Sequence, residues 1–216
     1  MKIIILGATG STGLDLLNQS LSDDKISEVI VFVRRKLHLK HPKLTCHVVN
    51  FDLPEKWNHL IEGDVVFSCL GTTLKDAGSK EAQFEVDYMY QYEFAHSAKI
   101  NGVKQYVLVS SVGASTKSPF FYTRIKGALE ESIQKLNFKE LIIFRPPSLI
   151  RPESTRNSEI IGVKLLQFLN KIGLFRSASP LPTEELAKAM LIASPSGVKG
   201  TRIFQAKDIR SLLQQA

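Results

Sequence analysis

The sequence has no hydrophobic run that approaches the ~20 residues a helix needs to span a membrane, so we expect no membrane span. It has only two cysteines, Cys46 and Cys69, in 216 residues. Neither C-x-x-C nor H-E-x-x-H spacing occurs among them and the five histidines, so the sequence predicts no metal site. Both cysteines lie in strand-like apolar runs, which favours buried free thiols over a disulfide framework and predicts a cytoplasmic protein.

The composition of the chain is that of an ordinary globular protein, with 44% hydrophobic and 23% charged residues. No low-complexity linker marks a boundary, so we expect residues 1–216 to form a single domain with a sizeable core. The net charge is +7. A nucleic acid or an anionic surface would explain that charge. We prefer the alternative, in which part of it serves a phosphorylated cofactor, the rest is solvated, and no nucleic acid binds.

Residues 3–13, Ile-Ile-Ile-Leu-Gly-Ala-Thr-Gly-Ser-Thr-Gly, predict a buried strand, a glycine turn and the start of a helix. Glycines at this spacing allow a tight turn, close approach of the backbone to a pyrophosphate, and packing of helix on strand. The helix then directs its free N–H groups and positive dipole end at phosphates. The pattern predicts a dinucleotide site, with an ordinary glycine-rich turn as the alternative. Its expected members are Gly7, Thr9, Gly10, Ser11, Thr12 and Gly13.

Strands and helices alternate strictly along the chain up to Phe144. Strands are predicted over residues 28–33, 44–49, 64–70, 105–109 and 140–144, and helices over 14–21, 54–61, 80–100 and 120–136. This order indicates a Rossmann-type α/β fold, a doubly wound parallel sheet with helices on both faces. Residues ~147–216 are expected to form a small extension on the substrate side, with helices over 158–172, 184–193 (N-capped by Thr183) and 209–215 and a strand over 202–206.

The residues after the strand at 28–33 bear on the choice of nicotinamide cofactor. An NAD site usually has an acidic side chain there, ~20 residues past the glycines, to hold the ribose 2′-hydroxyl. This chain has Arg34, Arg35 and Lys36, and guanidinium groups bind phosphate bidentately. The sequence therefore predicts NADPH/NADP, with a nucleic-acid patch or a solvated loop as alternatives. Asp52, after the next strand, either accepts a hydrogen bond from the adenine amino group or caps the following helix.

Tyr122 and Lys126 form a Tyr-x-x-x-Lys motif on a predicted helix, where a spacing of four places both on one face. A phenol with a pKa of ~10 exchanges protons poorly near neutrality, and a neighbouring ammonium stabilises the phenolate. The alternative is an ordinary surface pair. Just upstream, Ser110 and Ser111 end a strand at the edge where parallel sheets bind ligands, so a serine hydroxyl there could hydrogen-bond a substrate carbonyl.

These motifs resemble the short-chain dehydrogenase/reductase superfamily in its atypical or extended NAD(P)-binding branch, and most closely the Tat-interacting-protein-30-like NADPH-binding oxidoreductases. The resemblance covers nearly the whole chain. It rests on Gly-Ala-Thr-Gly-Ser-Thr-Gly (7–13), Val-Arg-Arg (33–35), Cys-Leu-Gly-Thr-Thr (69–73), Ser-Ser-Val-Gly-Ala (110–114), Phe-Tyr-Thr-Arg-Ile-Lys-Gly (121–127) and Phe-Arg-Pro (144–146).

The resemblance implies a role for each matching residue. Tyr122 is the general acid for carbonyl reduction, Lys126 assists it and holds the nicotinamide ribose, and Ser111, or else Ser110, polarises the carbonyl. The implied cofactor contacts are residues 9–12, Arg34, Arg35, Leu70, Gly71, Leu149 and Arg156. Many members carry an asparagine for a proton relay in the long helix, where this chain departs from the pattern with Val86 and Asp87.

The leading functional hypothesis is therefore an NADPH-dependent reductase of a small carbonyl or quinone. Phe120, Phe121 and the helix at 158–172 would wall an apolar substrate pocket, or else belong to the core. The second hypothesis is an NADPH-binding sensor that acts through a protein partner with little turnover. A sugar-nucleotide epimerase or dehydratase is the third. A homodimer is compatible with each of them.

Overall fold

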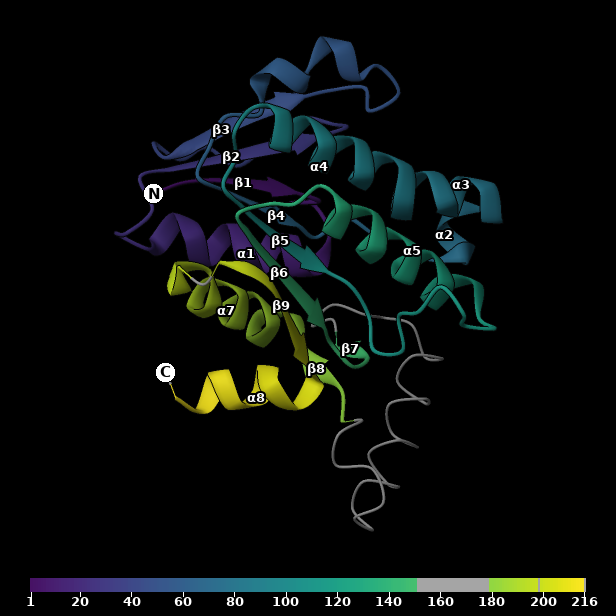
Figure 1. Cartoon of the computed structure of the whole chain (residues 1–216). Helices are drawn as coiled ribbons and strands as arrows, with labels where there is room; N and C mark the ends of the chain where they lie inside the picture. Colours follow the sequence, from purple (N-terminus) through teal and green to yellow (C-terminus); the bar gives the residue numbers. More distant parts are fainter. Residues whose placement is uncertain (151–178, 198, 216) are drawn as a thin grey trace.

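The computed structural model of the protein describes residues 1–150, 179–197 and 199–215. Its centre is a seven-stranded parallel sheet with the strand order β3-β2-β1-β4-β5-β6-β9 (Figure 1). The strands are β1 (Lys2–Leu6), β2 (Glu28–Val33), β3 (Leu44–Val48), β4 (Val65–Ser68), β5 (Gln105–Val109), β6 (Glu140–Arg145) and β9 (Gly200–Gln205). The order reverses between β1 and β4, as in a doubly wound Rossmann-type fold, so the predicted fold class is confirmed.

Helices cover both faces of this sheet. Figure 1 shows α1, α7 and α8 on one face and α3, α4 and α5 on the other. Their bounds are α1 (Ser11–Ser22), α2 (Leu74–Ala77), α3 (Lys80–Phe84), α4 (Tyr90–Ile100), α5 (Phe121–Lys135), α7 (Thr183–Ala193) and α8 (Ala206–Gln214). A π-helical turn, Glu85–Met89, joins α3 to α4. Short 3₁₀ turns lie at Pro54–Lys56, Asn58–Leu60 and Ser194–Ser196. A separate parallel pair joins β7 (Leu149–Ile150) to β8 (Leu181–Pro182).

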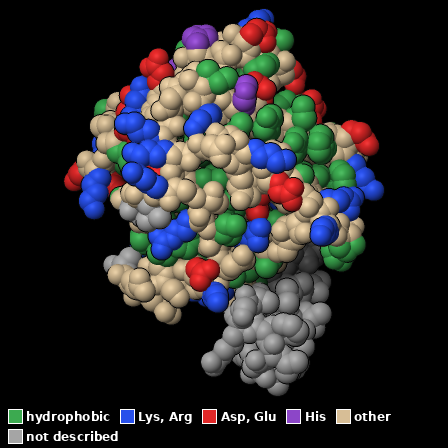
Figure 2. All heavy atoms as spheres, in the orientation of Figure 1, with side chains coloured by type: hydrophobic (Ala, Val, Ile, Leu, Met, Phe, Trp, Pro, Cys, Tyr) green, Lys and Arg blue, Asp and Glu red, His purple; other side chains and the backbone are tan. Residues whose placement is uncertain are grey.

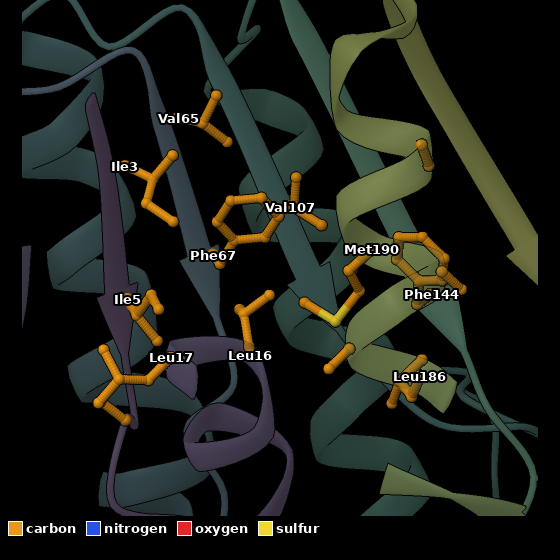
Figure 3. Close-up of a cluster of buried hydrophobic side chains, with 14 of the residues drawn as sticks. Ile3, Ile5, Leu16, Leu17, Val65, Phe67, Val107, Phe144, Leu186 and Met190 are labelled. Atoms are coloured by element: carbon orange, nitrogen blue, oxygen red, sulfur yellow. The ribbon is translucent and has the colours of Figure 1, made fainter. Parts of the chain in front are cut away.

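The two faces of the sheet carry separate hydrophobic clusters, because successive side chains of a strand point in opposite directions. Ile3 of β1 belongs to the cluster that includes Leu16 of α1 and Leu186 of α7, part of which is drawn in Figure 3. Its neighbour Ile4 belongs to the other cluster, with Phe94 of α4. This two-sided burial explains why the strands read as continuous apolar runs.

Several predicted elements differ from the observed ones in detail. The helix predicted over 54–61 is two 3₁₀ turns, and Trp57 at their junction donates its Nε1–H to the Asn50 carbonyl at 2.9 Å. The helix predicted over 80–100 is interrupted by the π-helical turn. Helix α1 begins at Ser11, three residues earlier than predicted. Thr183 is the first residue of α7 rather than its N-cap, which is Pro182.

The surface gives no sign of one dominant basic patch on the face shown in Figure 2, where Lys and Arg side chains occur in several places with Asp and Glu among them. Within the described ranges, no helix combines the length and the apolar character that crossing a bilayer requires. In the same residues, no three His, Cys, Asp or Glu side chains gather as metal ligands would. Cys46 and Cys69 are both unpaired thiols.

Candidate active site

A cavity of about 690 Å³ lies at the carboxyl ends of the central strands, the position at which open parallel sheets bind ligands. Its volume is in the range of small-molecule and cofactor sites. Among the residues predicted for the site, the cavity is lined by Thr9, Gly10, Ser11, Thr12, Leu70, Gly71, Tyr122, Lys126 and Leu149. The glycine turn, the loop after β4 and helix α5 therefore share one cavity.

The glycine turn owes its shape to two close approaches that exclude a side chain. Gly7 has φ +88°, and a Cβ there would lie 2.7 Å from the backbone nitrogen of Leu70. A Cβ at Gly13, in the first turn of α1, would lie 2.1 Å from the Gly7 carbonyl oxygen. Gly7 and Gly13 thus do not line the cavity themselves. They set the turn that brings residues 9–12 to its wall.

Helix α1 begins at this wall, with Gly10 at its N-cap position. The first N–H groups of a helix have no partner within the helix, and they carry the positive end of its dipole. Thr9, Ser11 and Thr12 add hydroxyl groups at the same place. The free N–H groups at the start of α1, next to Gly10, where no side chain blocks the approach of a ligand, fit the pyrophosphate of a dinucleotide.

Helix α5 brings the Tyr-x-x-x-Lys pair into the cavity as the spacing predicted. The Lys126 ammonium lies 5.9 Å from the centroid of the Tyr122 ring. Tyr122 remains 39% exposed, whereas Lys126 is only 2% exposed. The hydroxyl-bearing ring is thus open to a ligand, and the lysine is held in place beneath it.

The Lys126 ammonium is paired with Asp87, whose importance for the site the sequence did not reveal. Lys126 Nζ lies 3.1 Å from Asp87 Oδ1, and both side chains are buried. Burial lowers the pKa of Lys126, but its electrostatic interactions with Tyr122 and Asp87 outweigh that effect and raise the pKa above its ordinary value. Lys126 is therefore a permanent cation at physiological pH. The sequence contained one indication of this role: Asp87 lies in the long helix where many members of the superfamily carry an asparagine.

The two serines after β5 do not take the positions that their proposed role requires. Ser110 lines the cavity, but its hydroxyl donates to Glu130, which is also held by Arg145 Nε at 3.0 Å. Ser111 is not among the lining residues, and its hydroxyl donates to the Val112 carbonyl at 3.2 Å. In this arrangement neither serine hydroxyl is directed at a substrate carbonyl.

Arg34, Arg35 and Asp52 lie outside the cavity lining. The Asp52 carboxylate accepts a hydrogen bond from the Tyr90 hydroxyl and does not cap the 3₁₀ turn that follows. Burial, together with Asp52, raises the pKa of Tyr90, and the nearby charge of Arg34 opposes that shift. Arg34, directly after β2, and Asp52, in the segment after β3, therefore both act on the Tyr90 hydroxyl. Arg34 and Arg35 are both exposed.

Sequence analysis missed several lining residues and misplaced one. Phe121 lines the cavity, but Phe120 is 73% exposed and does not. The further lining residues are Cys69, Thr72, Thr73, Leu74, Asp76, Gln83, Val109 and Thr183. Burial raises the pKa of the Cys69 thiol to about 12, so it remains protonated. Arg156 and the helix predicted over 158–172 lie outside the described residues.

A comparison with known protein families matches residues 7–164 to the family described as NAD(P)H-binding. Fold and cavity thus define a nicotinamide dinucleotide-binding protein of the Rossmann type. The chain belongs to the NAD(P)H-binding family, within the atypical NAD(P)-binding branch of the short-chain dehydrogenase/reductase superfamily.

Its relatives include "Protein HTATIP2" of Rattus norvegicus, 35% identical over 196 residues that cover 88% of this chain and 79% of the relative. They also include "Protein FMP52, mitochondrial" of Candida albicans, 32% identical over 207 residues that cover 93% and 90% of the two chains. The resemblance to the Tat-interacting-protein-30-like group, inferred from short motifs, is confirmed by the match to HTATIP2, which extends over most of the chain.

Solved structures show the same fold in proteins of low sequence identity. The enzyme WbmH of Bordetella bronchiseptica, solved in complex with NAD⁺, superposes with a TM-score of 0.72 at 18% identity, covering 99% of this chain and 79% of that one. The UDP-glucose 4-epimerase of Thermotoga maritima superposes with a TM-score of 0.70 at 12% identity, covering 100% and 82%. At such identities the likeness establishes the fold.

The predicted cytoplasmic location is contradicted by the relatives, because the fungal proteins are named as mitochondrial. The prediction came from Cys46 and Cys69 as free thiols. Unpaired cysteines argue only against an oxidising compartment, so they do not separate the cytosol from other reducing compartments.

Proposed function

We propose that the protein is an NADPH-dependent oxidoreductase that reduces a small carbonyl or quinone. The observation that carries this proposal is that Tyr122 and Lys126 share one cavity with the glycine turn and the start of α1. NADPH, when bound, supplies the hydride. Tyr122 supplies the proton from its hydroxyl, and the charge of Lys126 favours the phenolate that remains.

The other residues divide between the two halves of the cofactor. We assign the pyrophosphate to residues 9–12, the nicotinamide side to Leu70, Gly71 and Leu149, and the 2′-phosphate to Arg34 and Arg35. Asp52 is assigned to the adenosine half. In this proposal residues 1–216 form one NAD(P)-binding domain, with the part from ~147 onward on the substrate side.

The test of the catalytic assignment is Tyr122→Phe, which removes one hydroxyl and keeps the ring. We expect turnover of a responsive quinone or aldehyde to fall about 10²- to 10⁴-fold, with NADPH affinity within twofold of wild type. Tyr92→Phe is the matched control, because Tyr92 lies on α4, stacks on Tyr88 of the preceding π-helical turn and does not line the cavity. Unchanged turnover in Tyr122→Phe removes Tyr122 from the mechanism.

The choice of NADPH over NADH is tested by titrating both cofactors into wild type and into a variant with Arg34→Asp and Arg35→Ala. Wild type should prefer NADPH, and the variant should lose that preference, because a carboxylate repels the 2′-phosphate. Equal wild-type affinities for the two cofactors exclude this assignment.

An NADPH-binding sensor with little turnover is a second candidate, favoured by the two serines. Ser110 gives its hydroxyl to Glu130 and Ser111 lies off the cavity, so neither serine is directed at a substrate carbonyl in this arrangement. Tight NADPH binding without NADPH consumption across a panel of quinones and aldehydes favours the sensor, whose effect would pass to a protein partner.

For the location we propose mitochondria, on the strength of the names of the fungal relatives. Fractionation of cells that express the tagged protein tests this. Recovery with mitochondrial markers is expected, and recovery in the soluble cytosolic fraction alone contradicts it.

A further inference from the structure

Asp87 is a buried charge that the proposed mechanism does not use. Its side chain is 0% exposed, and its Oδ1 lies 3.1 Å from the Lys126 ammonium. Oδ2 accepts a hydrogen bond from the backbone N–H of Thr72 at 3.3 Å. One carboxylate thus contacts both the lysine of α5 and the loop that follows β4, and Lys126 and Thr72 both line the cavity.

The position of Asp87 is fixed from the opposite side as well. It lies in the π-helical turn Glu85–Met89, a local irregularity that occurs frequently at functional sites. Its carbonyl accepts a hydrogen bond from Gln91 Nε2 at 2.9 Å, and Gln91 Oε1 accepts one from Ser68 Oγ at 2.8 Å. Ser68 ends β4, so the turn is attached to the central sheet directly below the loop.

The space around the ion pair is tight. A Cβ at Gly71 would lie 3.2 Å from Asp87 Oδ1 and 3.8 Å from Lys126 Nζ. The backbone of the loop therefore lies directly against the ion pair. A buried carboxylate in such a place is costly unless it is paired, so any shift of Asp87 moves its partners with it.

We propose that Asp87 is a positioning residue that acts through Lys126 and Thr72, holding the α5 lysine and the loop after β4 in one fixed arrangement toward the bound cofactor. This rests on the proposed function, since the bound cofactor is NADPH. Asp87 touches no reacting atom. Without the Asp87 side chain, the Lys126 ammonium would be free to leave the place where it meets the nicotinamide ribose. The loop after β4 would also lose the hydrogen bond that its Thr72 N–H donates to Asp87.

The experiment is a double-mutant cycle with Asp87→Asn, Lys126→Met and the double variant, read out by NADPH titration and by urea unfolding. Asparagine is close in size to aspartate, so it removes the charge with little change of volume. We expect each single variant to bind NADPH about 10- to 100-fold more weakly, the range of a hydrogen bond to a charged group. The double variant should bind no more weakly than Lys126→Met alone, because the asparagine oxygen can still accept the Thr72 N–H and the lost charge acts through the lysine.

Unfolding provides a second readout that does not depend on the cofactor. Each single variant leaves one buried charge unpaired, so both should unfold at lower urea concentration than the double variant. Glu85→Gln is the matched control, since Glu85 is an exposed carboxylate in the same turn. It should leave NADPH affinity within twofold of wild type.

Wild-type NADPH affinity in Asp87→Asn overturns the inference, and so does the same loss of affinity from Asp87→Asn with and without Lys126. A coupling seen in unfolding but absent from NADPH affinity also overturns it, because Asp87 would then be structural only. Failure of wild type to bind NADPH is a different outcome and refutes the proposed function itself.

Discussion

Replacing Gly13 with alanine tests whether the glycine turn is held by direct contact between backbones. The new Cβ would lie 2.1 Å from the Gly7 carbonyl oxygen, 2.7 Å from the Gly7 carbonyl carbon and 3.0 Å from the Ala8 Cα. None of these atoms belongs to a side chain that can rotate away, so the turn or the helix must shift. Overpacking of this kind costs about 1–3 kcal/mol, and more in severe cases.

The gain in helix propensity opposes that cost but is smaller. Alanine is favoured over glycine in a helix by about 1 kcal/mol, and a clash with fixed backbone belongs at the upper end of the overpacking range. We therefore expect Gly13→Ala to lower the free energy of unfolding by at least about 2 kcal/mol. For a chain of this length that corresponds to a fall in Tm of about 4–8 °C.

Gly10→Ala is the matched control in the same turn. A Cβ at Gly10 meets only the Gly7 carbonyl oxygen, at 3.4 Å, and the backbone there has φ −80° and ψ 164°, which alanine adopts freely. Its unfolding free energy should stay within about 1 kcal/mol of wild type, since only the N-cap preference changes. Urea unfolding of both variants measures the difference. Equal stability of Gly13→Ala and wild type refutes the reasoning.

Two further predictions concern ionisable side chains that are buried, the Glu130 carboxylate and the Cys69 thiol. Glu130→Gln removes the charge of a buried carboxylate that pairs with the partly exposed Arg145, and should cost about 1.5–3 kcal/mol of unfolding free energy. Glu131→Gln, at an exposed neighbour on α5, should change it by less than about 0.5 kcal/mol; equal losses in urea unfolding contradict this. The Cys69 thiol, with its pKa raised to about 12 by burial, should resist iodoacetamide at pH 8 in the folded protein and react as the pH approaches that value; rapid labelling at pH 8, seen by mass spectrometry, contradicts it.

The sheet could be predicted from the sequence because its information is local. Strands β2 and β5 have the predicted bounds, since a strand buried on both faces is a short continuous run of apolar residues. The glycine turn was equally visible, because the close contacts at Gly7 and Gly13 leave no other residue type. The spacing of Tyr122 and Lys126 placed both in the cavity for the same reason, a helical repeat of four residues.

The partners of the polar groups could not be predicted in this way. Asp87 and Lys126 are 39 positions apart, and their contact depends on a π-helical turn for which the sequence carries no pattern. Ser110 looked like a substrate contact until its position next to Glu130 was known. Side-chain hydrogen bonds between distant segments depend on how helices pack on the sheet, which hydrophobic periodicity alone does not determine.

The cavity is therefore a product of strand register. Strands β1 and β4 pair with Ile4 opposite Val66, and β4 and β5 pair with Val66 opposite Tyr106. Because all three run parallel, the segments that follow them reach the same edge, and a slip by one residue would turn every side chain to the wrong face. Two hydrophobic clusters oppose such a slip. Hydrophobic clusters on both faces hold the sheet and the helices that pack on it in place. The helical segments that carry Asp87 and Lys126 are therefore fixed relative to each other, which keeps the distance between the two charges defined.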